Sequence, residues 1–164
     1  MCKQVRATDR AFAAILEHGS VVTWGDTRFG GYSSAVQDQL KRVQYFSASG
    51  SAFAAMLENG SVATWGHPPA GGHSSTVQDQ LKNVKQLQAA SGAFAAILEN
   101  GSVFTWDYPE FGGYSSAVQD QLKSVQQLYA SGGAFAAILE NGSIVAWGYP
   151  ESGGDSCAVQ YEMK

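Results

Sequence analysis

Four glutamates recur at one spacing along the chain, and carboxylates at such a spacing could act together. Glu17, Glu58, Glu99 and Glu140 follow one another at intervals of 41 residues. In a molecule with four-fold symmetry they would form a ring of carboxylates, and oxygen ligands of this kind bind hard cations. Each glutamate, however, comes just before a glycine-containing turn, where solvated side chains are typical. The solvated interpretation is therefore favoured.

The other potential metal ligands are sparse. His67 and His73 flank the segment HPPAGGH, but no third ligand is evident, so solvent-exposed loop histidines are expected. Cys2 and Cys157 lie near opposite ends of the chain and in no metal-binding spacing. Two reduced thiols are favoured, with a disulfide between the two ends as the alternative. We predict no metal and no cofactor.

The chain carries no recognisable catalytic motif. Neither GxSxG, HExxH, a P-loop nor a GxGxxG after a strand occurs in it, so we expect no enzyme activity. A net charge of −4 and a pI of about 5.2 argue against a nucleic-acid partner. No apolar run approaches the roughly 20 residues that span a bilayer, and the N-terminus does not resemble a secretory signal. We expect a soluble intracellular protein, cytoplasmic or organellar after removal of a leader.

The segment after each tryptophan is where the chain varies most. The four copies read GDTRFGGY, GHPPAGGH, DYPEFGGY and GYPESGGD, whereas the surrounding sequence hardly changes. A second variable set precedes each AFAA segment, at residues 9–10, 50–51, 91–92 and 132–133. Variable loops on a constant frame are typical of binding surfaces, with plain drift as the alternative. The candidate partner-binding residues are Arg28, Tyr32, His67, His73, Tyr108, Phe111, Tyr114 and Tyr149.

These loops belong to a repeat that fills the whole sequence. The tryptophans at 24, 65, 106 and 147 are each 41 residues apart, and paired glycines keep the same step. We therefore predict one repeat domain, 1–164, made of the repeats 1–41, 42–82, 83–123 and 124–164. The recurring tryptophans are expected to pack between repeats.

Each repeat contains the pattern of a β-hairpin. In the third repeat, AFAAILEN and SVFTW flank an Asn-Gly pair, which favours a type I′ turn with a positive φ at both residues. The first of these strands is apolar on both faces and rich in alanine. This pattern predicts a strand packed closely between two neighbouring sheets.

The stretch before the hairpin allows two structures. Val77, Leu81, Val84 and Leu87 fit a helical stripe that Ser74 or Ser75 could cap. The last of these residues also fit a short strand that leads into the hairpin. A repeat of short strands and a hairpin plus a short helix both remain open.

The run AFAAILENGSVFTW and the glycine loop after it resemble the regulator of chromosome condensation (RCC1-like) repeat. Trp24-Gly25, Trp65-Gly66 and Trp147-Gly148 match the Trp-Gly step of that repeat, and Trp106-Asp107 departs from it. The resemblance implies an all-β propeller-type protein with four blades of about four short antiparallel strands. The family usually closes seven blades, so this chain could form a closed four-blade ring, an open arc that pairs with a second copy, or a part of a longer protein.

The resemblance and the variable loops together lead to a functional hypothesis. We expect a non-enzymatic protein-interaction or scaffold module, with membership of a larger assembly as an extension of that role. Its expected partner is another protein, and ring completion would allow a homodimer. A multivalent carbohydrate-binding propeller is the alternative, with one aromatic or acidic loop site per repeat.

Overall fold

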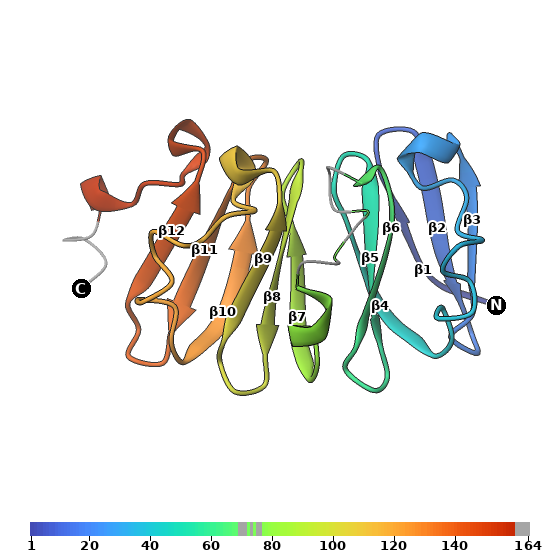
Figure 1. Ribbon diagram of the computed structural model, residues 1–164, viewed down its shortest axis with the longest axis horizontal. Helices are drawn as coiled ribbons and strands as arrows, with labels where there is room; N and C mark the ends of the chain where they lie inside the picture. The colour runs from blue at the N-terminus through green and yellow to red at the C-terminus, as the bar shows by residue number, and fades with distance from the viewer. Residues whose placement is uncertain (69–71, 73, 75–76, 160–164) are drawn as a thin grey trace.

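The computed structural model describes residues 1–68, 72, 74 and 77–159, and it consists of four antiparallel three-stranded sheets (Figure 1). Each sheet lies within one of the 41-residue repeats. The all-β, propeller-type prediction is confirmed. The strands are β1 (Cys2–Ala7), β2 (Ala11–Leu16), β3 (Val21–Gly25), β4 (Val43–Ala48), β5 (Ala52–Leu57), β6 (Val62–Gly66), β7 (Val84–Ala89), β8 (Ala93–Leu98), β9 (Val103–Asp107), β10 (Val125–Ala130), β11 (Ala134–Leu139) and β12 (Ile144–Gly148).

The turn of the hairpin lies at the Asn-Gly pair, as predicted. Its backbone geometry differs from that of the predicted type I′ turn. In the third repeat Gly101 has a left-handed φ of +83°, whereas the φ of Asn100 is not positive. The Gly101 N–H donates to the Leu98 carbonyl (2.9 Å), and the Ser102 N–H donates to the Asn100 side-chain oxygen (2.9 Å). A turn closed by one left-handed glycine thus replaces the predicted type I′ turn, because the asparagine side chain bonds the backbone two residues on.

The hairpin-plus-helix alternative is wrong. The second repeat ends in a single 3-10 turn, η3 (Gln78–Gln80), and Val84 begins the strand β7. β7 pairs with β8 along its length, and this pairing satisfies the backbone groups that a helix would have bonded internally. The alternative helix cap Ser75 lies outside the described residues.

The predicted number of about four strands per sheet is too high, because the described residues form three. In the first repeat, residues 33–40 form turns and irregular structure, and their side chains bond the edge of β3. The Gln37 amide donates to the Val21 carbonyl (3.3 Å), and the Ser33 hydroxyl donates to the Gln37 side-chain oxygen (3.0 Å). The same Gln-to-strand bond recurs in the next two repeats, and it occupies an edge that would otherwise be open to pairing.

The apolar core lies between the sheets. Between the first two sheets, Ala13 and Ile15 of β2 pack against Phe53 and Trp65 of the second sheet, and all four are buried. Alanines along the central strands let the facing aromatic rings approach closely. Equivalent clusters separate the second sheet from the third and the third from the fourth.

Three of the four tryptophans confirm the predicted packing between repeats. Trp65, Trp106 and Trp147 are at most 4% exposed. Trp24 is 48% exposed, so the prediction is wrong at this position. The reason is that Trp24 lies on the outer face of the first sheet, which no described residue covers.

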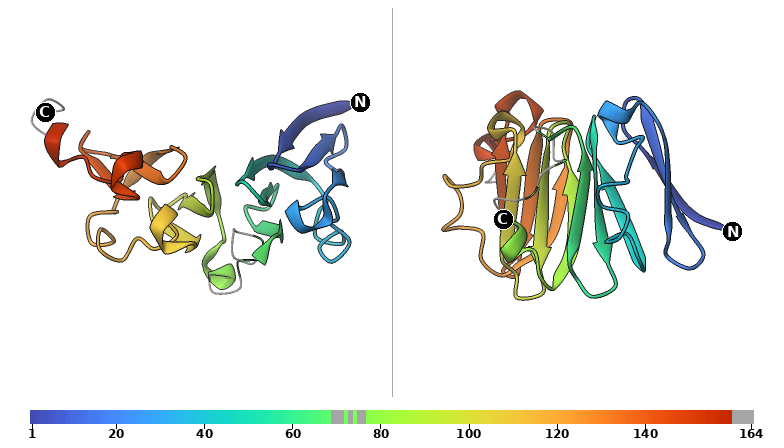
Figure 2. Two further views of the ribbon diagram at one scale, coloured as in Figure 1. Left: turned by 90° about the horizontal axis from the view of Figure 1, so that it is seen from above. Right: turned by 45° about the vertical axis from the view of Figure 1, so that its right-hand side comes forward.

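The four sheets form an open arc rather than a closed ring. The strands β1, β4, β7 and β10 contact one another in succession, and the first and fourth sheets lie at opposite ends of the arc (Figure 2). The closed four-blade ring is therefore not formed. Cys2 and Cys157 are both free and exposed, so the alternative disulfide is absent.

Asp107 is the one residue of the described chain that breaks the Trp-Gly step. The equivalent glycines 25, 66 and 148 have φ values between +110° and +113°, and Asp107 has a φ of +80°, a region that L-residues other than Asn and Asp rarely enter. Within the described residues its buried Oδ2 atom has no hydrogen-bond partner. Burial raises the pKa of this carboxyl from its ordinary value of 3.8 to about 7.

The raised pKa makes stability depend on pH. Between the two pKa values the folded state holds a proton that the unfolded state has lost, so the free energy of unfolding falls as pH rises from about 4 to about 7. We expect a loss of about 1–2 kcal/mol between pH 5 and pH 8, less than the full shift would give because water reaches part of the side chain. Chemical denaturation at both pH values measures it.

The matched variants are Asp107→Asn and Asp107→Gly. Both remove the charge, and glycine also relieves the backbone, so both should be more stable than the wild type at pH 8. The difference in stability between Asp107→Asn and the wild type isolates the contribution of this carboxyl. If the free energy of unfolding fell equally in the wild type and in Asp107→Asn between pH 5 and pH 8, the pH dependence could not be assigned to Asp107.

Candidate functional site

The two variable segments of each repeat meet at one edge of the arc. The register of the hairpin places the turn before the second strand beside the loop after the third strand, since Ala11 pairs with Gly25. The Asp26 N–H donates to the Arg10 carbonyl (2.9 Å), and the Tyr108 N–H donates to the Gly92 carbonyl (3.2 Å). We call this edge, the upper one in Figure 1, the rim. It consists of the described residues of 9–10, 26–32, 50–51, 67–74, 91–92, 107–114, 132–133 and 149–155.

The loops of the rim have a common backbone. A single 3-10 turn is present in three of them: η1 (Thr27–Phe29), η4 (Pro109–Phe111) and η5 (Pro150–Ser152). Each turn ends on a glycine with a φ between +94° and +99°. A side chain on Gly30 would meet the Phe53 ring of the next repeat at 2.6 Å, so glycine is required there.

A series of backbone hydrogen bonds links the rim from repeat to repeat. The Asp9 N–H donates to the Gly50 carbonyl (2.8 Å), the Gly50 N–H to the Ser91 carbonyl (2.9 Å) and the Ser91 N–H to the Gly132 carbonyl (2.8 Å). These bonds do not depend on side-chain identity. The turns can therefore vary in sequence while their positions stay the same.

Four of the candidate residues project from the rim. Tyr32 and Tyr114 occupy equivalent positions and are each 67% exposed. Tyr149 is exposed as well, and so is His67. His73 lies outside the described residues. The described members of this group present aromatic surface that the other described residues leave partly exposed.

Tyr108 and Phe111 are less exposed than these residues, because their rings contact each other and the turn beside them. Their rings meet edge-on, with centroids 6.2 Å apart. Both rings lie over Gly92, where a side chain would meet Tyr108 at 2.6 Å and Phe111 at 2.9 Å. Phe111 also packs against the core between the third and fourth sheets. These two residues hold the third loop on its turn and leave only part of each ring exposed.

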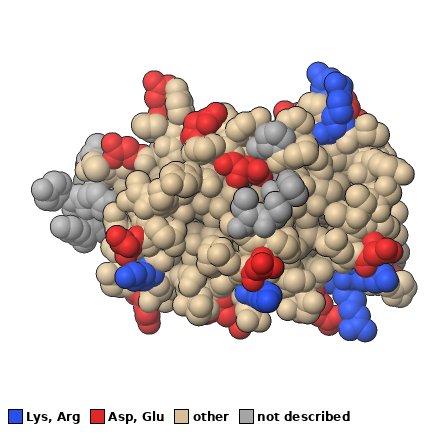
Figure 3. All heavy atoms as spheres, in the orientation of Figure 1, with Lys and Arg blue, Asp and Glu red and all other residues tan. Residues whose placement is uncertain are grey.

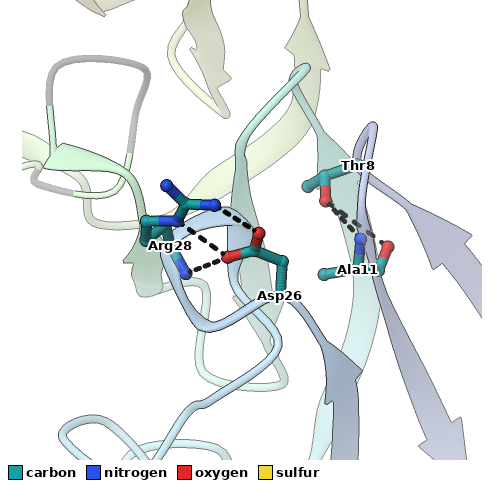
Figure 4. Close-up of polar contacts among 4 residues, drawn as sticks. All are labelled: Thr8, Ala11, Asp26 and Arg28. Atoms are coloured by element: carbon teal, nitrogen blue, oxygen red, sulfur yellow. Dashed lines mark hydrogen bonds and ion pairs between the residues drawn. The ribbon is translucent and has the colours of Figure 1, made fainter.

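Arg28 is held by a neighbour on the same loop (Figure 4). Its Nη2 donates to Asp26 Oδ2 (2.9 Å), and its Nε donates to Asp26 Oδ1 (3.2 Å). The side-chain hydrogen bond from Arg28 lowers the pKa of Asp26 below its usual value, and the same bond raises the pKa of Arg28. In the same view, the Thr8 hydroxyl accepts the Ala11 N–H (3.1 Å), which fixes the turn beside this loop.

Charge is distributed unevenly along the rim. Arg10 and Arg28 are both in the first repeat, whereas the third and fourth loops carry Glu110, Glu151 and Asp155 with no lysine or arginine. In the space-filling view the basic side chains of the upper edge lie at one end and acidic side chains lie along the rest (Figure 3). The sequence reasoning missed Arg10 as a site residue, although it lies over the Phe29 ring at 5.3 Å. The register of the hairpin, in which Ala11 pairs with Gly25, was the signal that could have placed Arg10 beside this loop.

The recurring glutamates do not gather into a cation site. Glu17 is 3.6 Å from the N-terminal amino group, and Glu58 is 3.2 Å from Arg42. Across the described positions no group of three or more His, Cys, Asp or Glu is arranged to hold a metal. The same positions include no helix that is long and apolar enough to cross a bilayer.

Neither a protein-family model nor a curated protein matches this chain in sequence. Solved structures match it in fold. Yeast RCC1 (Prp20), solved with Kap60 bound, is 16% identical with a TM-score of 0.66, and 90% of this chain covers 43% of that chain. Prp20p from Saccharomyces cerevisiae is 17% identical with a TM-score of 0.64, the covered shares being 90% and 44%.

Human WBSCR16 is 17% identical with a TM-score of 0.60, and the covered shares are 90% and 47%. This chain thus spans less than half the length of each of these three proteins. At such low identity the similarity concerns the fold alone. The protein has the fold of an RCC1-like propeller.

Proposed function

We propose that the chain is a non-enzymatic protein-interaction module and that the rim is its binding surface. One observation carries this proposal. In all four repeats, the two segments that vary in sequence are joined by a backbone hydrogen bond at the same edge, at distances of 2.8–3.2 Å. A constant scaffold that presents variable loops together is the arrangement that binding surfaces use.

The chemistry of the rim favours a partner with basic groups. In the third and fourth repeats the exposed rings of Tyr114 and Tyr149 lie on a loop edge that also carries Glu110, Glu151 and Asp155. Tyrosine rings and carboxylates both attract lysine and arginine, the rings through cation–π contacts. Tyrosine is also enriched among the residues that contribute most to protein interfaces.

Proteins of the same fold bind other proteins. Yeast RCC1 was solved with Kap60 bound, and Prp20p is described with binding properties to Gsp1p and histones. These two structures support the general point that proteins of this fold can bind other proteins. Membership of a larger assembly would follow from the same role.

A carbohydrate-binding role fits the rim less well. A multivalent lectin would repeat one pocket, whereas the equivalent positions carry Tyr32, Tyr114 and Asp155. The third loop also uses Tyr108 and Phe111 to hold its own turn, which leaves less ring surface for a sugar. We therefore place protein binding first. The expectation of a homodimer concerns the ends of the arc and not the rim.

Quantitative affinity capture from a lysate of the source cells tests the proposal. The rim variant replaces Tyr114 and Tyr149 with alanine. Each exposed tyrosine that anchors a partner should contribute on the order of 2 kcal/mol, so we expect at least a ten-fold loss of the captured partner. The matched control replaces Glu99 and Lys82, at the opposite edge, with alanine.

A protein retained by the wild type and the control, and lost by the rim variant, supports the proposal. Equal retention by the rim variant would contradict the placement of the binding surface. Binding to a glycan array that the rim variant loses would favour the carbohydrate-binding role instead.

A further inference from the structure

The contact between successive sheets has two different faces, and the arc exposes one of them at each end. In each sheet the forward face is turned toward the following sheet and the rear face toward the preceding one. Between the third and fourth sheets, for example, Ala95 and Ile97 of the forward face pack against Phe135 and Trp147 of the rear face. Among the described residues, no sheet covers the rear face of the first sheet or the forward face of the fourth.

The rear face of the first sheet is apolar and open. Phe12 is 44% exposed and Trp24 is 48% exposed, whereas the equivalent Phe53 and Trp65 are 0% and 4% exposed. The two open rings are stacked, with centroids 5.4 Å apart, as the buried pairs are. Val5 and Val22 extend this apolar face, and each is 45% exposed. A surface of this kind is costly to leave in water.

The forward face of the fourth sheet is also open, and it carries the small and aliphatic residues against which Phe and Trp rings pack elsewhere in the chain. Ala136 and Ile138 are partly exposed, whereas the equivalent Ala95 and Ile97 are fully buried. Beside them lies a hollow of about 240 Å³, whose lining includes Ala134, Ala136, Ser152 and Gly153. Residues equivalent to these receive the Phe and Trp rings of the next sheet elsewhere in the chain.

Gly153, at the end of η5, lacks among the described residues the partners that the equivalent Gly30 and Gly112 have. The Gly30 carbonyl accepts a hydrogen bond from Trp65 Nε1 (3.1 Å), and the Phe53 ring lies against Gly30. Gly112 has the same two partners from the fourth repeat. Gly153 has the same left-handed backbone, with a φ of +99°, but no described atom lies within 4 Å of the position of a side chain. The residues with the matching repeat positions are Phe12 and Trp24.

Backbone bonds between repeats end in the same way. Within the described residues, the series that runs from Asp9 through Gly50 and Ser91 ends at the Gly132 carbonyl. The residue that would accept from the Gly132 N–H in the next repeat corresponds to Asp9. A second series joins each hairpin turn to the following repeat, and its last described bond is the one that the Val125 N–H donates to the Gly101 carbonyl (3.1 Å).

We propose that a second copy of this chain covers both open faces. Its rear face would pack on the forward face of the first copy, with Phe12 and Trp24 against Gly153 and the hollow beside it. The faces match at the aromatic contact, since Phe12, Trp24 and Gly153 occupy the repeat positions that form this contact within the chain. The occupant is therefore a second copy rather than an unrelated protein.

Two copies are sufficient to close the contact. Each copy supplies one forward and one rear face, so a pair satisfies both contacts and forms a ring of eight sheets without open faces. The pairing uses the ends of the arc and leaves the rim free, so it does not depend on the proposed binding function.

The mass of the protein in solution tests the proposal. We expect native mass spectrometry and sedimentation to show twice the 17.4 kDa of one chain. Trp24→Glu, on the rear face, and Ile138→Glu, on the forward face, should each be monomeric. Circular dichroism and thermal unfolding verify that both variants remain folded. Tyr32→Glu, an equally drastic change on the rim, is the matched control and should remain paired.

Mixing the two variants tests the direction of the contact. The Trp24→Glu chain keeps its forward face and the Ile138→Glu chain keeps its rear face, so the mixture should form pairs that contain one chain of each. A monomeric wild type at every concentration would overturn the proposal. Pairing by the wild type without pairing in the mixture would overturn the head-to-tail contact.

Discussion

Every sheet in this protein depends on its neighbours for burial. A three-stranded sheet that is apolar on both faces exposes both of them to water unless other sheets cover them, and this exposure is unfavourable. In the second repeat, Phe53 and Trp65 cover the sheet before them, and Ala52 and Ala54 receive the sheet after them. The energy of the fold therefore lies between repeats, as in other repeat proteins. Such an architecture stabilises its interior repeats more than its two ends.

This constraint explains which parts of the repeat are constant. The Phe and Trp rings fit over a glycine of the preceding loop, so Gly30 and Gly112 cannot carry a side chain. Alanines in the central strands keep the distance between sheets short. The serine and glutamine side chains that bond the edge of the third strand recur as well. Variation is confined to segments that backbone hydrogen bonds hold in place, and these segments form the rim.

Much of the fold could be predicted from the 41-residue spacing. Identical intervals between Trp65, Trp106 and Trp147 required equivalent environments, and the structure buries all three. The prediction is wrong at Trp24 because no described sheet covers the face on which this residue lies. The turn type and the number of strands in each sheet were mispredicted for a different reason. Both depend on side-chain hydrogen bonds, from Asn100 and Gln37, which strand patterns do not reveal.

The candidate site was predictable in part. Sequence variation pointed to the loops after each tryptophan, and to the turns before each hairpin, as two separate sets. Their meeting at one rim follows from the pairing of Ala11 with Gly25, a register that the hairpin sequence does imply. The support that Tyr108 and Phe111 give to Gly92 could not be predicted, because it depends on the path of the 3-10 turn.

The most direct test of the account is the rate at which the indole N–H of Trp24 exchanges with solvent, measured beside that of Trp65. Trp65 Nε1 is buried and bonded to Gly30 within the chain. If the ends of the arc are two halves of the same contact, the Trp24 indole will exchange as slowly as that of Trp65. Fast exchange at Trp24 beside slow exchange at Trp65 would show that the first sheet stays open in solution, and it would contradict the account.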